Sequence, residues 1–231
     1  KIPAGMFTRC NQLRALLLND SNRGRLRNQE SGRIDRGRLA NLVAGDTRVF
    51  QRRHPKQDTN TFVQVAVDAS GSMYPDETLS ALILLNKVFA GTEIKHEILA
   101  WAGGGNFRLT EMISEHDQVS NAWKLGSYWW LRGGGTPTTG ALFKCGNRLV
   151  SRKDTRKIMI VVSDGNPNFD QEGGEVKRLC NEVLPGNGIE VMGVSIGDKC
   201  NLNKLIDDCA HAENFSDFPQ VLIDTARRAL L

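Results

Sequence analysis

The sequence predicts an α/β fold in which helices flank a doubly wound, mostly parallel sheet of six strands. Two runs of residues, 62–67 and 158–162, are almost entirely apolar and rich in β-branched side chains. Short runs of this kind are typical of strands that are buried on both faces of a parallel sheet. From Thr61 onward such runs alternate with helical segments, and this alternation favours a Rossmann-like arrangement.

The individual elements follow from apolar periodicity and from the residues that stop each run. Strands are expected at residues 62–67, 97–101, 107–113, 158–162, 189–196 and 214–215. Helices are expected at residues 75–90, 117–130, 175–184, 202–209 and 219–231, and one more ends at residue 150. Pro75 suits the first turn of its helix. The short connection at residues 103–105 favours a hairpin, which makes 107–113 the one antiparallel edge strand.

The first 57 residues are predicted to form a basic N-terminal extension, partly helical and partly extended, that packs on the main domain, residues 58–231. We expect a helix at 6–18, an irregular stretch or hairpin at 23–32, an extended stretch at 47–52 and a polar linker at 53–58. Asp35 is suited to cap a short helix at 36–44, and Gly45 is suited to end it.

Charge is distributed unevenly along the chain. Residues 1–60 contain 13 Lys/Arg and 5 Asp/Glu, whereas the remaining residues contain 17 and 21. A basic arm of this kind raises nucleic-acid binding as an alternative function. The arm lacks the interleaved aromatic and basic residues on which bases stack. We therefore expect its arginines to form a solvated face or a protein-docking face.

Composition places the chain among ordinary globular proteins. Its 231 residues are 40% hydrophobic and 24% charged, which is enough for a sizeable core. No apolar run approaches the ~20 residues of a membrane-spanning helix, so no membrane association is expected. Five cysteines without a Cys-x-x-Cys pattern favour reduced thiols and a cytoplasmic protein, with a bridge between Cys200 and Cys209 as the alternative. Because the chain begins with Lys1, we expect it to be part of a longer protein.

Oxygen-bearing side chains follow the two buried strands at their carboxyl ends. Asp68, Ser70 and Ser72 come directly after the first strand, Asp164 follows the other, and Thr136 follows three glycines before a helix. Ligand sites of open α/β sheets lie beyond the carboxyl ends of the strands, so we expect these side chains to converge. Carboxylate and hydroxyl oxygens suit Mg²⁺ or a similar divalent ion better than zinc or copper.

Each of these segments also has a simpler explanation. Asp68 and Asp164 are suited to capping helices, and Ser70 and Ser72 are suited to holding a turn. For either segment alone we favour that explanation. The occurrence of all five residues in this order favours a metal site.

The combination of motifs resembles the von Willebrand factor A (VWA) domain over residues 61–231. DxSxS at 68–72, GGGT at 133–136 and a strand ending in SDG at 163–165 correspond to the metal-ion-dependent adhesion site (MIDAS) of that family. The resemblance implies that Ser70 and Ser72 coordinate Mg²⁺ (or Mn²⁺ or Ca²⁺) directly. It implies that Asp68 and Asp164 bind directly or through water, and that Thr136 alternates between the two. One coordination position would stay open for a carboxylate from a partner protein.

A second resemblance is more specific. The segments SGRIDRGRLA at 31–40, GDTRVF at 45–50 and RKIMIVVSDGNP at 156–167 are similar to the C-terminal part of CobT-like proteins of bacteria and phages. CobT is a subunit of aerobic cobaltochelatase, which inserts cobalt into a corrin ring in cobalamin biosynthesis with the AAA+ ATPase CobS and the large subunit CobN. The chain departs from that family in lacking its long upstream acidic stretch.

This resemblance implies a cytoplasmic, non-catalytic docking subunit, in a bacterium or encoded by a phage. Its partner would be an AAA+ ATPase of the CobS or MoxR kind whose acidic residue completes the metal site, with the large chelatase subunit as a further partner. The alternative is an adaptor of another MoxR-type or phage machine that is unrelated to cobalamin.

The absence of common enzyme motifs from the sequence favours a binding role over catalysis. The sequence contains no GxxxxGK[ST], GxSxG or HExxH, so ATP would be hydrolysed by another chain. Two rival classes remain open. One is a Mg²⁺-dependent hydrolase that uses Asp68 and Asp164, and the other is an extracellular adhesion module.

A few further residues are weaker candidates. Trp129 and Trp130 lie beside the expected metal edge and belong either to the core or, if exposed, to a partner surface. Asp170 and Asp198 are candidates for contacts around the metal. The four histidines lack ligand spacing, and we expect surface or satisfied core residues at these positions.

Overall fold

The computed structural model describes residues 8, 10–12, 15, 25–38, 45–53, 60–89, 92, 94–103, 108–164, 172–197, 200–214 and 216–230. The chain forms two compact units, of which one comprises residues 1–14 and 60–231 and the other residues 15–59. The packing of the N-terminal extension on the main domain stays a prediction.

The main unit is built on a six-stranded sheet with the order β6-β5-β4-β7-β8-β9. Its strands are β4 (Thr61–Asp68), β5 (Lys95–Ala102), β6 (Arg108–Ile113), β7 (Arg156–Ser163), β8 (Ile189–Ile196) and β9 (Cys209–Ala212). Neighbouring strands pair in parallel except β5 and β6, which pair antiparallel at the edge. The predicted sheet is therefore confirmed: it has six strands, it is mostly parallel, and its one antiparallel strand lies at an edge.

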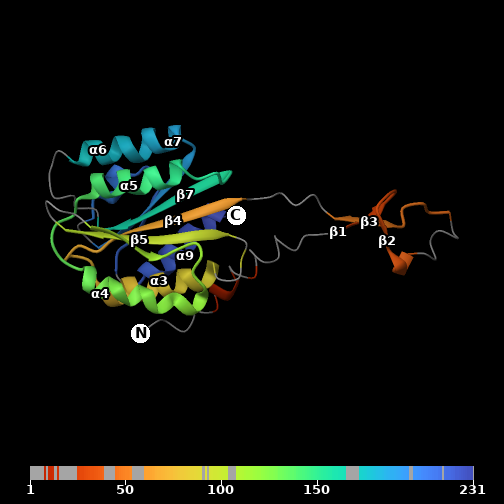
Figure 1. Ribbon diagram of the computed structural model, residues 1–231, viewed down its shortest axis with the longest axis horizontal. Helices are drawn as coiled ribbons and strands as arrows, with labels where there is room; N and C mark the ends of the chain where they lie inside the picture. Colours follow the sequence, from red (N-terminus) through yellow and green to blue (C-terminus); the bar gives the residue numbers. More distant parts are fainter. Residues whose placement is uncertain are drawn as a thin grey trace. The chain divides into compact units, whose positions relative to one another are not determined.

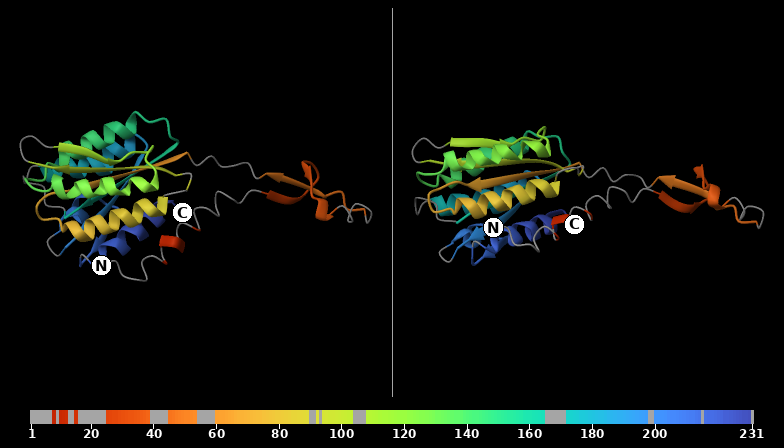
Figure 2. Two further views of the ribbon diagram at one scale, coloured as in Figure 1. Left: turned by 60° about the horizontal axis from the view of Figure 1, so that its bottom comes forward. Right: turned by 90° about the horizontal axis from the view of Figure 1, so that it is seen from below.

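Helices cover both faces of this sheet (Figures 1 and 2). One face carries α5 (Thr138–Val150), α6 (Glu172–Arg178) and α7 (Leu184–Gly186), and the other carries α3 (Pro75–Phe89), α4 (Tyr128–Leu131) and α9 (Phe218–Leu230). The remaining helical segments are the 3₁₀ helix η2 (Val119–Ser127), the π-helical turn η3 (Leu179–Val183) and α8 (Leu202–Leu205).

The core explains why the central strands are apolar on both sides. All eight residues of β4 are buried. Phe62 and Ala66 share a hydrophobic cluster with Leu142 and Cys145 of α5. The intervening valines of β4 are buried as well, which is what a sheet covered by helices on both faces requires. The sheet thus holds the ends of β4 and β7 side by side at its carboxyl edge.

Two predictions near the C-terminus were wrong. The last strand is β9, Cys209–Ala212, and not residues 214–215, and the helix expected at 202–209 ends at Leu205. β9 pairs in parallel with β8, and a Cβ on Gly193 would lie 2.8 Å from the Cys209 sulfur. A glycine in β8 therefore makes room for the close approach of Cys209.

The second unit contains a small three-stranded sheet with the order β1-β3-β2. Its strands are β1 (Arg25–Gln29), β2 (Arg33–Ile34) and β3 (Phe50–Arg53), and both outer strands pair antiparallel with β3. The expected hairpin at 23–32 was therefore wrong in its pairing, because β1 and β2 do not pair with each other. Asp35 accepts a hydrogen bond from the Gly37 amide at 3.2 Å and precedes the 3₁₀ turn η1 (Arg36–Arg38).

Other N-terminal predictions are confirmed where the structure describes them. Residues 8, 10–12 and 15 are helical, and β3 lies in the stretch expected to be extended. Gly45 has a φ of 85°, and the helix predicted before it stays a prediction beyond the 3₁₀ turn η1. Residues 39–44 and the linker at 54–58 lie outside the described part of the chain.

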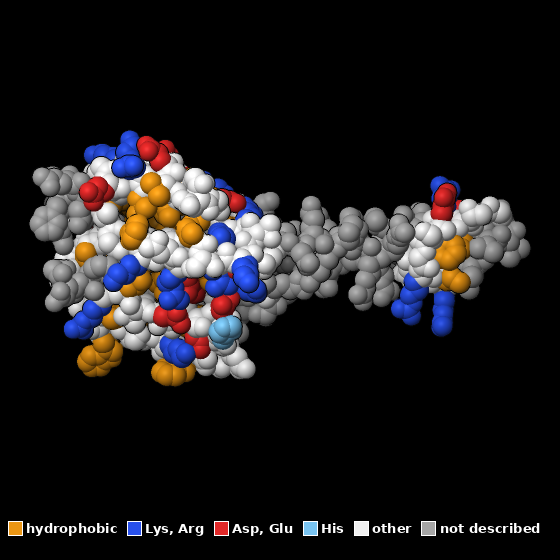
Figure 3. Space-filling view, turned by 45° about the horizontal axis from the view of Figure 1, so that its top comes forward, with side chains coloured by type: hydrophobic (Ala, Val, Ile, Leu, Met, Phe, Trp, Pro, Cys, Tyr) orange, Lys and Arg blue, Asp and Glu red, His pale blue; other side chains and the backbone are white. Residues whose placement is uncertain are grey.

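The surface of the main unit is mixed in character. In the view of Figure 3, Lys, Arg, Asp and Glu side chains are interspersed around hydrophobic side chains. The exposed large hydrophobic residues of the described main unit are Tyr74, Trp123, Trp129, Trp130, Phe143, Val150 and Val183. None of the described helices is long and apolar enough to cross a bilayer.

Candidate functional site

The carboxylate of Asp68 is enclosed at the carboxyl edge of the sheet. Asp68 ends β4 and is fully buried. Its Oδ1 accepts a hydrogen bond from the Ser70 amide at 2.8 Å, and its Oδ2 accepts one from the Ser163 hydroxyl at 2.7 Å. The Asp68 carbonyl accepts a third from the Tyr128 hydroxyl at 2.7 Å. These bonds fix both the side chain and the backbone at the point where the strand ends.

The two serines of the DxSxS motif lie together on the turn that follows. The hydroxyls of Ser70 and Ser72 are 3.0 Å apart. Ser70 is buried and Ser72 is exposed, so the pair reaches from the sheet edge to the surface. The Met73 amide closes the turn on the Ser70 carbonyl at 3.3 Å. Two hydroxyl oxygens are thus held side by side near one carboxylate.

Asp164 lies beside this turn because β7 pairs with β4. Val162 is the register partner of Val67, so Asp164 and Asp68 extend from neighbouring strand ends. Asp164 is 8% exposed, and its buried Oδ1 has no hydrogen-bond partner among the described residues. Its negative charge also acts on Asp68. A buried acceptor without a donor calls for a specific explanation, and a bound ion is one.

Thr136 reaches the same edge through the glycine loop. The Gly133 amide donates a hydrogen bond to the Ala69 carbonyl at 3.3 Å, which places the loop against the Asp68 turn. Gly134 has a φ of 80°, and a Cβ there would lie 2.9 Å from the Cα of Gly103. Only glycine suits both constraints. Thr136 itself is buried and directly precedes the segment that opens α5.

Burial dominates the electrostatics of this edge. It raises the pKa of Asp68 to about 6, hydrogen bonds from Ser163 and Ser70 oppose the rise, and the charge of Asp164 adds to it. Burial also raises the pKa of Tyr128, with a further contribution from Asp68. Neither Asp68 nor Asp164 forms an ion pair with a described Lys or Arg. The protein alone therefore disfavours a negative charge here, and a cation would reverse that preference.

The donor set fits a hard cation. Among described side chains, no group of three or more His, Cys, Asp and Glu residues could hold a metal ion, so a site here would depend on hydroxyl oxygens as well. Ser70, Ser72, Asp68 and Asp164 supply two hydroxyls and two carboxylates within hydrogen-bonded or electrostatic reach of one another. Oxygen donors of this kind suit Mg²⁺, Mn²⁺ or Ca²⁺.

Three residues of this edge were not assigned a role from the sequence. Ser163 orients Asp68, and its position directly before Asp164 is the signal that was available. Tyr128 contacts the Asp68 carbonyl from α4. Arg132 donates to the carbonyls of Gly71 and Met73, at 3.3 and 3.4 Å. Long-range contacts of this kind carry no sequence signature.

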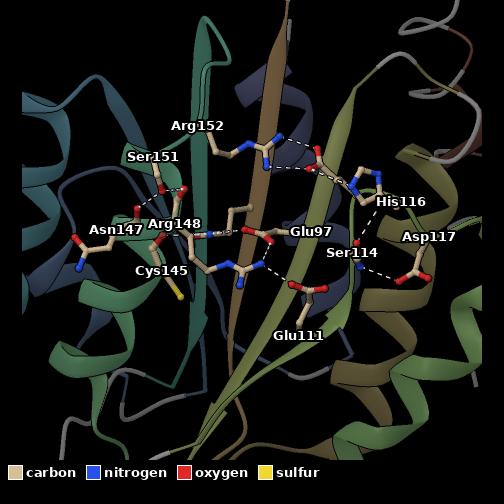
Figure 4. Close-up of polar contacts among 12 residues, drawn as sticks. Glu97, Glu111, Ser114, His116, Asp117, Cys145, Asn147, Arg148, Ser151 and Arg152 are labelled. Atoms are coloured by element: carbon tan, nitrogen blue, oxygen red, sulfur yellow. Dashed lines mark hydrogen bonds and ion pairs between the residues drawn. The ribbon is translucent and has the colours of Figure 1, made fainter.

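The carboxylates at the opposite edge and on the α5 face are paired with arginines (Figure 4). Arg152 bonds to Glu115 and to Asp154, with N–O distances of 2.7 Å in each case. Arg148 of α5 joins Glu97 of β5 to Glu111 of β6. Such pairing accounts for these acidic groups without any ligand.

The described histidines and cysteines do not belong to this donor set. The ring of His96 is buried and bonds to Asn86 at 2.9 Å, and burial lowers its pKa to about 4. His211 bonds to Ser195, and His116 is exposed. All five cysteines are free, so the alternative Cys200–Cys209 bridge is not formed. His54, Asp170 and Asp198 lie outside the described residues.

Comparison with known proteins identifies the class. The order of the strands and the flanking helices are those of a VWA domain. The chain belongs to the family described as VWA domain containing CoxE-like protein, whose model matches residues 10–185. No curated protein matches the chain significantly in sequence. The family match does not single out CobT.

Solved structures show the same fold at low sequence identity. Proximal thread matrix protein 1 of the mussel byssus, with a zinc-occupied MIDAS motif, aligns with a TM-score of 0.57 and 16% identity over 74% of this chain and 46% of that one. The pilus adhesin SpaC of Lactobacillus rhamnosus GG gives 0.56 and 15% over 74% and 30%. BatB of Bacteroides thetaiotaomicron gives 0.54 and 14% over 73% and 98%. The chain thus spans less than half of the first two proteins.

Proposed function

We propose that this chain is a non-catalytic protein-binding module that works through a divalent cation. The observation that carries the proposal is the state of the two carboxylates at the carboxyl edge. Asp68 is buried with a raised pKa, and Asp164 has a buried oxygen without a donor among the described residues. The turn that directly follows Asp68 carries a pair of hydroxyls. This combination is costly for a protein alone and favourable around a cation.

In the proposed site, Ser70, Ser72 and Thr136 supply hydroxyl oxygens, and Asp68 and Asp164 supply carboxylate oxygens directly or through water. Mg²⁺ takes six oxygens at about 2.0–2.1 Å and gives up its waters reluctantly. Hydroxyl ligands are neutral, so they leave much of the ion's charge uncompensated. A carboxylate from another protein is then a favoured ligand for the open position.

The proposed partner is an AAA+ ATPase of the MoxR or CobS kind. Membership of the CoxE-like VWA family and the CobT-like segments support this class of partner. The chain itself has no phosphate-binding GxxxxGK[ST] loop, so ATP hydrolysis would belong to the other protein. A cobaltochelatase-type complex that includes the large chelatase subunit is one setting for such a pair. Another MoxR-type or phage machine, unrelated to cobalamin, is the other.

The test is a binding assay between the chain and a purified AAA+ ATPase of the MoxR or CobS kind. We expect binding in Mg²⁺, loss of binding in EDTA and recovery when Mg²⁺ is added back. Asp68→Ala should abolish binding while the chain stays folded, as judged by circular dichroism. Equal binding with and without EDTA would contradict the proposal.

A further inference from the structure

Large aromatic side chains are exposed next to the Asp68 turn. Trp130 is 89% exposed and Trp129 47% exposed, and both belong to α4. Tyr74, at the end of the turn, is 55% exposed. Tryptophan is highly buried on average, and exposed groups of such rings on a soluble domain mark interaction surfaces. These three aromatic residues therefore need an explanation other than core packing.

Helix α4 is joined to the turn on two sides. Tyr128, its first residue, points inward and donates to the Asp68 carbonyl at 2.7 Å. Arg132, directly after the helix, donates to the carbonyls of Gly71 and Met73. The Arg132 guanidinium also lies 5.9 Å from the centre of the Trp129 ring, within cation–π range. The exposed tryptophans are thus fixed relative to the serine pair.

The polar groups of this surface determine the chemistry of what it binds. The indole nitrogens of Trp129 and Trp130 and the guanidinium of Arg132 are donors only. A cation held by the neighbouring turn would add further positive charge. A partner segment that covers this surface therefore needs acceptor groups, and it needs apolar side chains to cover the exposed rings.

We propose that Tyr74, Trp129, Trp130 and Arg132, here called the aromatic edge, form the second half of the partner-binding surface. The aromatic edge binds a partner segment in which a large apolar side chain lies within two residues of the carboxylate that reaches the cation. The cation supplies one anchor, and the tryptophans supply the other. This inference rests on the proposed function and specifies the partner sequence that the site recognises.

Interface tryptophans commonly contribute a large share of binding energy. Truncation of such a residue to alanine typically weakens binding about thirtyfold or more. We expect this loss for Trp130→Ala and for the Trp129→Ala/Trp130→Ala double variant. Phe143→Ala is the matched control, because Phe143 is 55% exposed on α5, which covers the opposite face of the sheet (Figure 1). Unchanged thermal unfolding of the variants would show that the fold is kept.

The experiment uses random twelve-residue peptides displayed on phage as the probe. The peptides are selected on the full chain in Mg²⁺, and the enriched peptides are then synthesised. Affinities are measured for the wild type, the tryptophan variants and Phe143→Ala, each in Mg²⁺ and in EDTA. The expected peptides carry Asp or Glu within two residues of an aromatic or large aliphatic residue. Their binding should fall about thirtyfold in the tryptophan variants and stay unchanged in Phe143→Ala.

The outcomes separate this inference from the proposed function. Peptides that need Mg²⁺ and an acidic residue but bind the tryptophan variants as well as the wild type would overturn the aromatic edge alone. Peptides that bind equally in EDTA but are lost with the tryptophan variants would overturn the metal-dependent function and support the surface. A selection that enriches no peptide binding to the wild-type chain would contradict both.

Discussion

The two edges of the central sheet stabilise buried carboxylates in opposite ways. At the amino edge, Asp154 is nearly inaccessible but bonds to Arg152 at 2.7 Å and to Lys95 at 3.4 Å. At the carboxyl edge, Asp68 is just as inaccessible, yet its bonds come from a serine hydroxyl and an amide. The first edge contains its own cations. At the second edge Arg132 bonds to backbone carbonyls of the turn, and neither Asp68 nor Asp164 forms an ion pair with a described Lys or Arg. This difference points to an ion or ligand that the chain does not itself supply.

The pKa values express the same contrast. Burial alone would raise the pKa of Asp154, but bonds from Arg152 and Lys95 hold it below the ordinary value. A bond from Arg152 likewise lowers the pKa of Glu115. Burial raises the pKa of Asp68 to about 6, because hydrogen bonds from Ser163 and Ser70 only partly oppose it. An acidic group is thus stabilised in its charged form at one edge and destabilised at the other.

The largest stability effect is expected from removing a cation at the amino edge. Arg152→Ala would leave Asp154 and Glu115 without their closest partner and would remove the guanidinium from above the Phe62 ring. Loss of one member of a buried pair costs about 3 kcal/mol in the free energy of unfolding. Urea denaturation at pH 7 measures this cost.

The control for that variant is an exposed pair. Arg156→Ala removes an ion pair with Glu190 in which both side chains are about half exposed. Exposed pairs typically contribute about 1 kcal/mol or less. Equal losses for Arg156→Ala and Arg152→Ala would mean that the amino-edge cluster is no more than a surface feature.

Replacing a buried aspartate by asparagine should change the free energy of unfolding in opposite directions at the two edges. The pKa of Asp68 in the folded state, about 6, lies above the ordinary value. The folded state therefore favours the protonated carboxyl. The stability that this preference contributes is full below pH 4 and is lost as pH rises through 6. Asp68→Asn should therefore stabilise the metal-free chain by about 2 kcal/mol at pH 8 and by little at pH 4.

Asp154→Asn should instead destabilise the chain at pH 8, by about 1 to 2 kcal/mol, because it removes the charge that Arg152 and Lys95 bind. Urea denaturation in EDTA at pH 4 and pH 8 measures the free energy of unfolding of both variants. Destabilisation by Asp68→Asn at pH 8 would show that the protein itself stabilises the charged Asp68 carboxylate without a cation. Saturating Mg²⁺ should reduce or reverse the advantage of Asp68→Asn, since only the wild type gains from binding.

A smaller effect is expected in the glycine loop. Gly134→Ala places a Cβ at a φ of 80° and 2.9 Å from the Gly103 Cα, which should cost about 1 to 2 kcal/mol and weaken Mg²⁺ binding through Thr136. Gly71→Ala is the control, because a Cβ there meets no atom within 4 Å. Thermal unfolding and Mg²⁺ titration of both variants would show whether the loop needs Gly134 specifically.

Much of the fold could be predicted because the central strands have a strong signal. The runs that form β4 and β7 are almost entirely apolar. The order of DxSxS, GGGT and SDG was readable by position. The strand β9 was missed because Cys-Ala-His-Ala is short and has no β-branched residue. Its place beside β8 needs the absence of a Cβ at Gly193, which sequence periodicity does not show.

The candidate residues of the site could be named from the sequence, but the hydrogen bonds that join them to the rest of the fold could not. Asp68, Ser70 and Ser72 are close in sequence, and their turn follows from local chemistry. The bond from Ser163 to Asp68 joins residues 95 positions apart and depends on the register of β4 with β7. The link from Arg132 to the turn depends in the same way on how α4 packs. Long-range pairing of this kind is decided by the folded sheet.

The most direct test of the central claim is a Mn²⁺ titration followed by electron paramagnetic resonance at pH 7.5. We expect one bound Mn²⁺ per chain, displaced by Mg²⁺, with at least tenfold weaker binding in Asp68→Asn and Asp164→Asn and unchanged binding in Asp154→Asn. Absence of bound Mn²⁺, or equal binding by wild type and Asp68→Asn, would contradict the account.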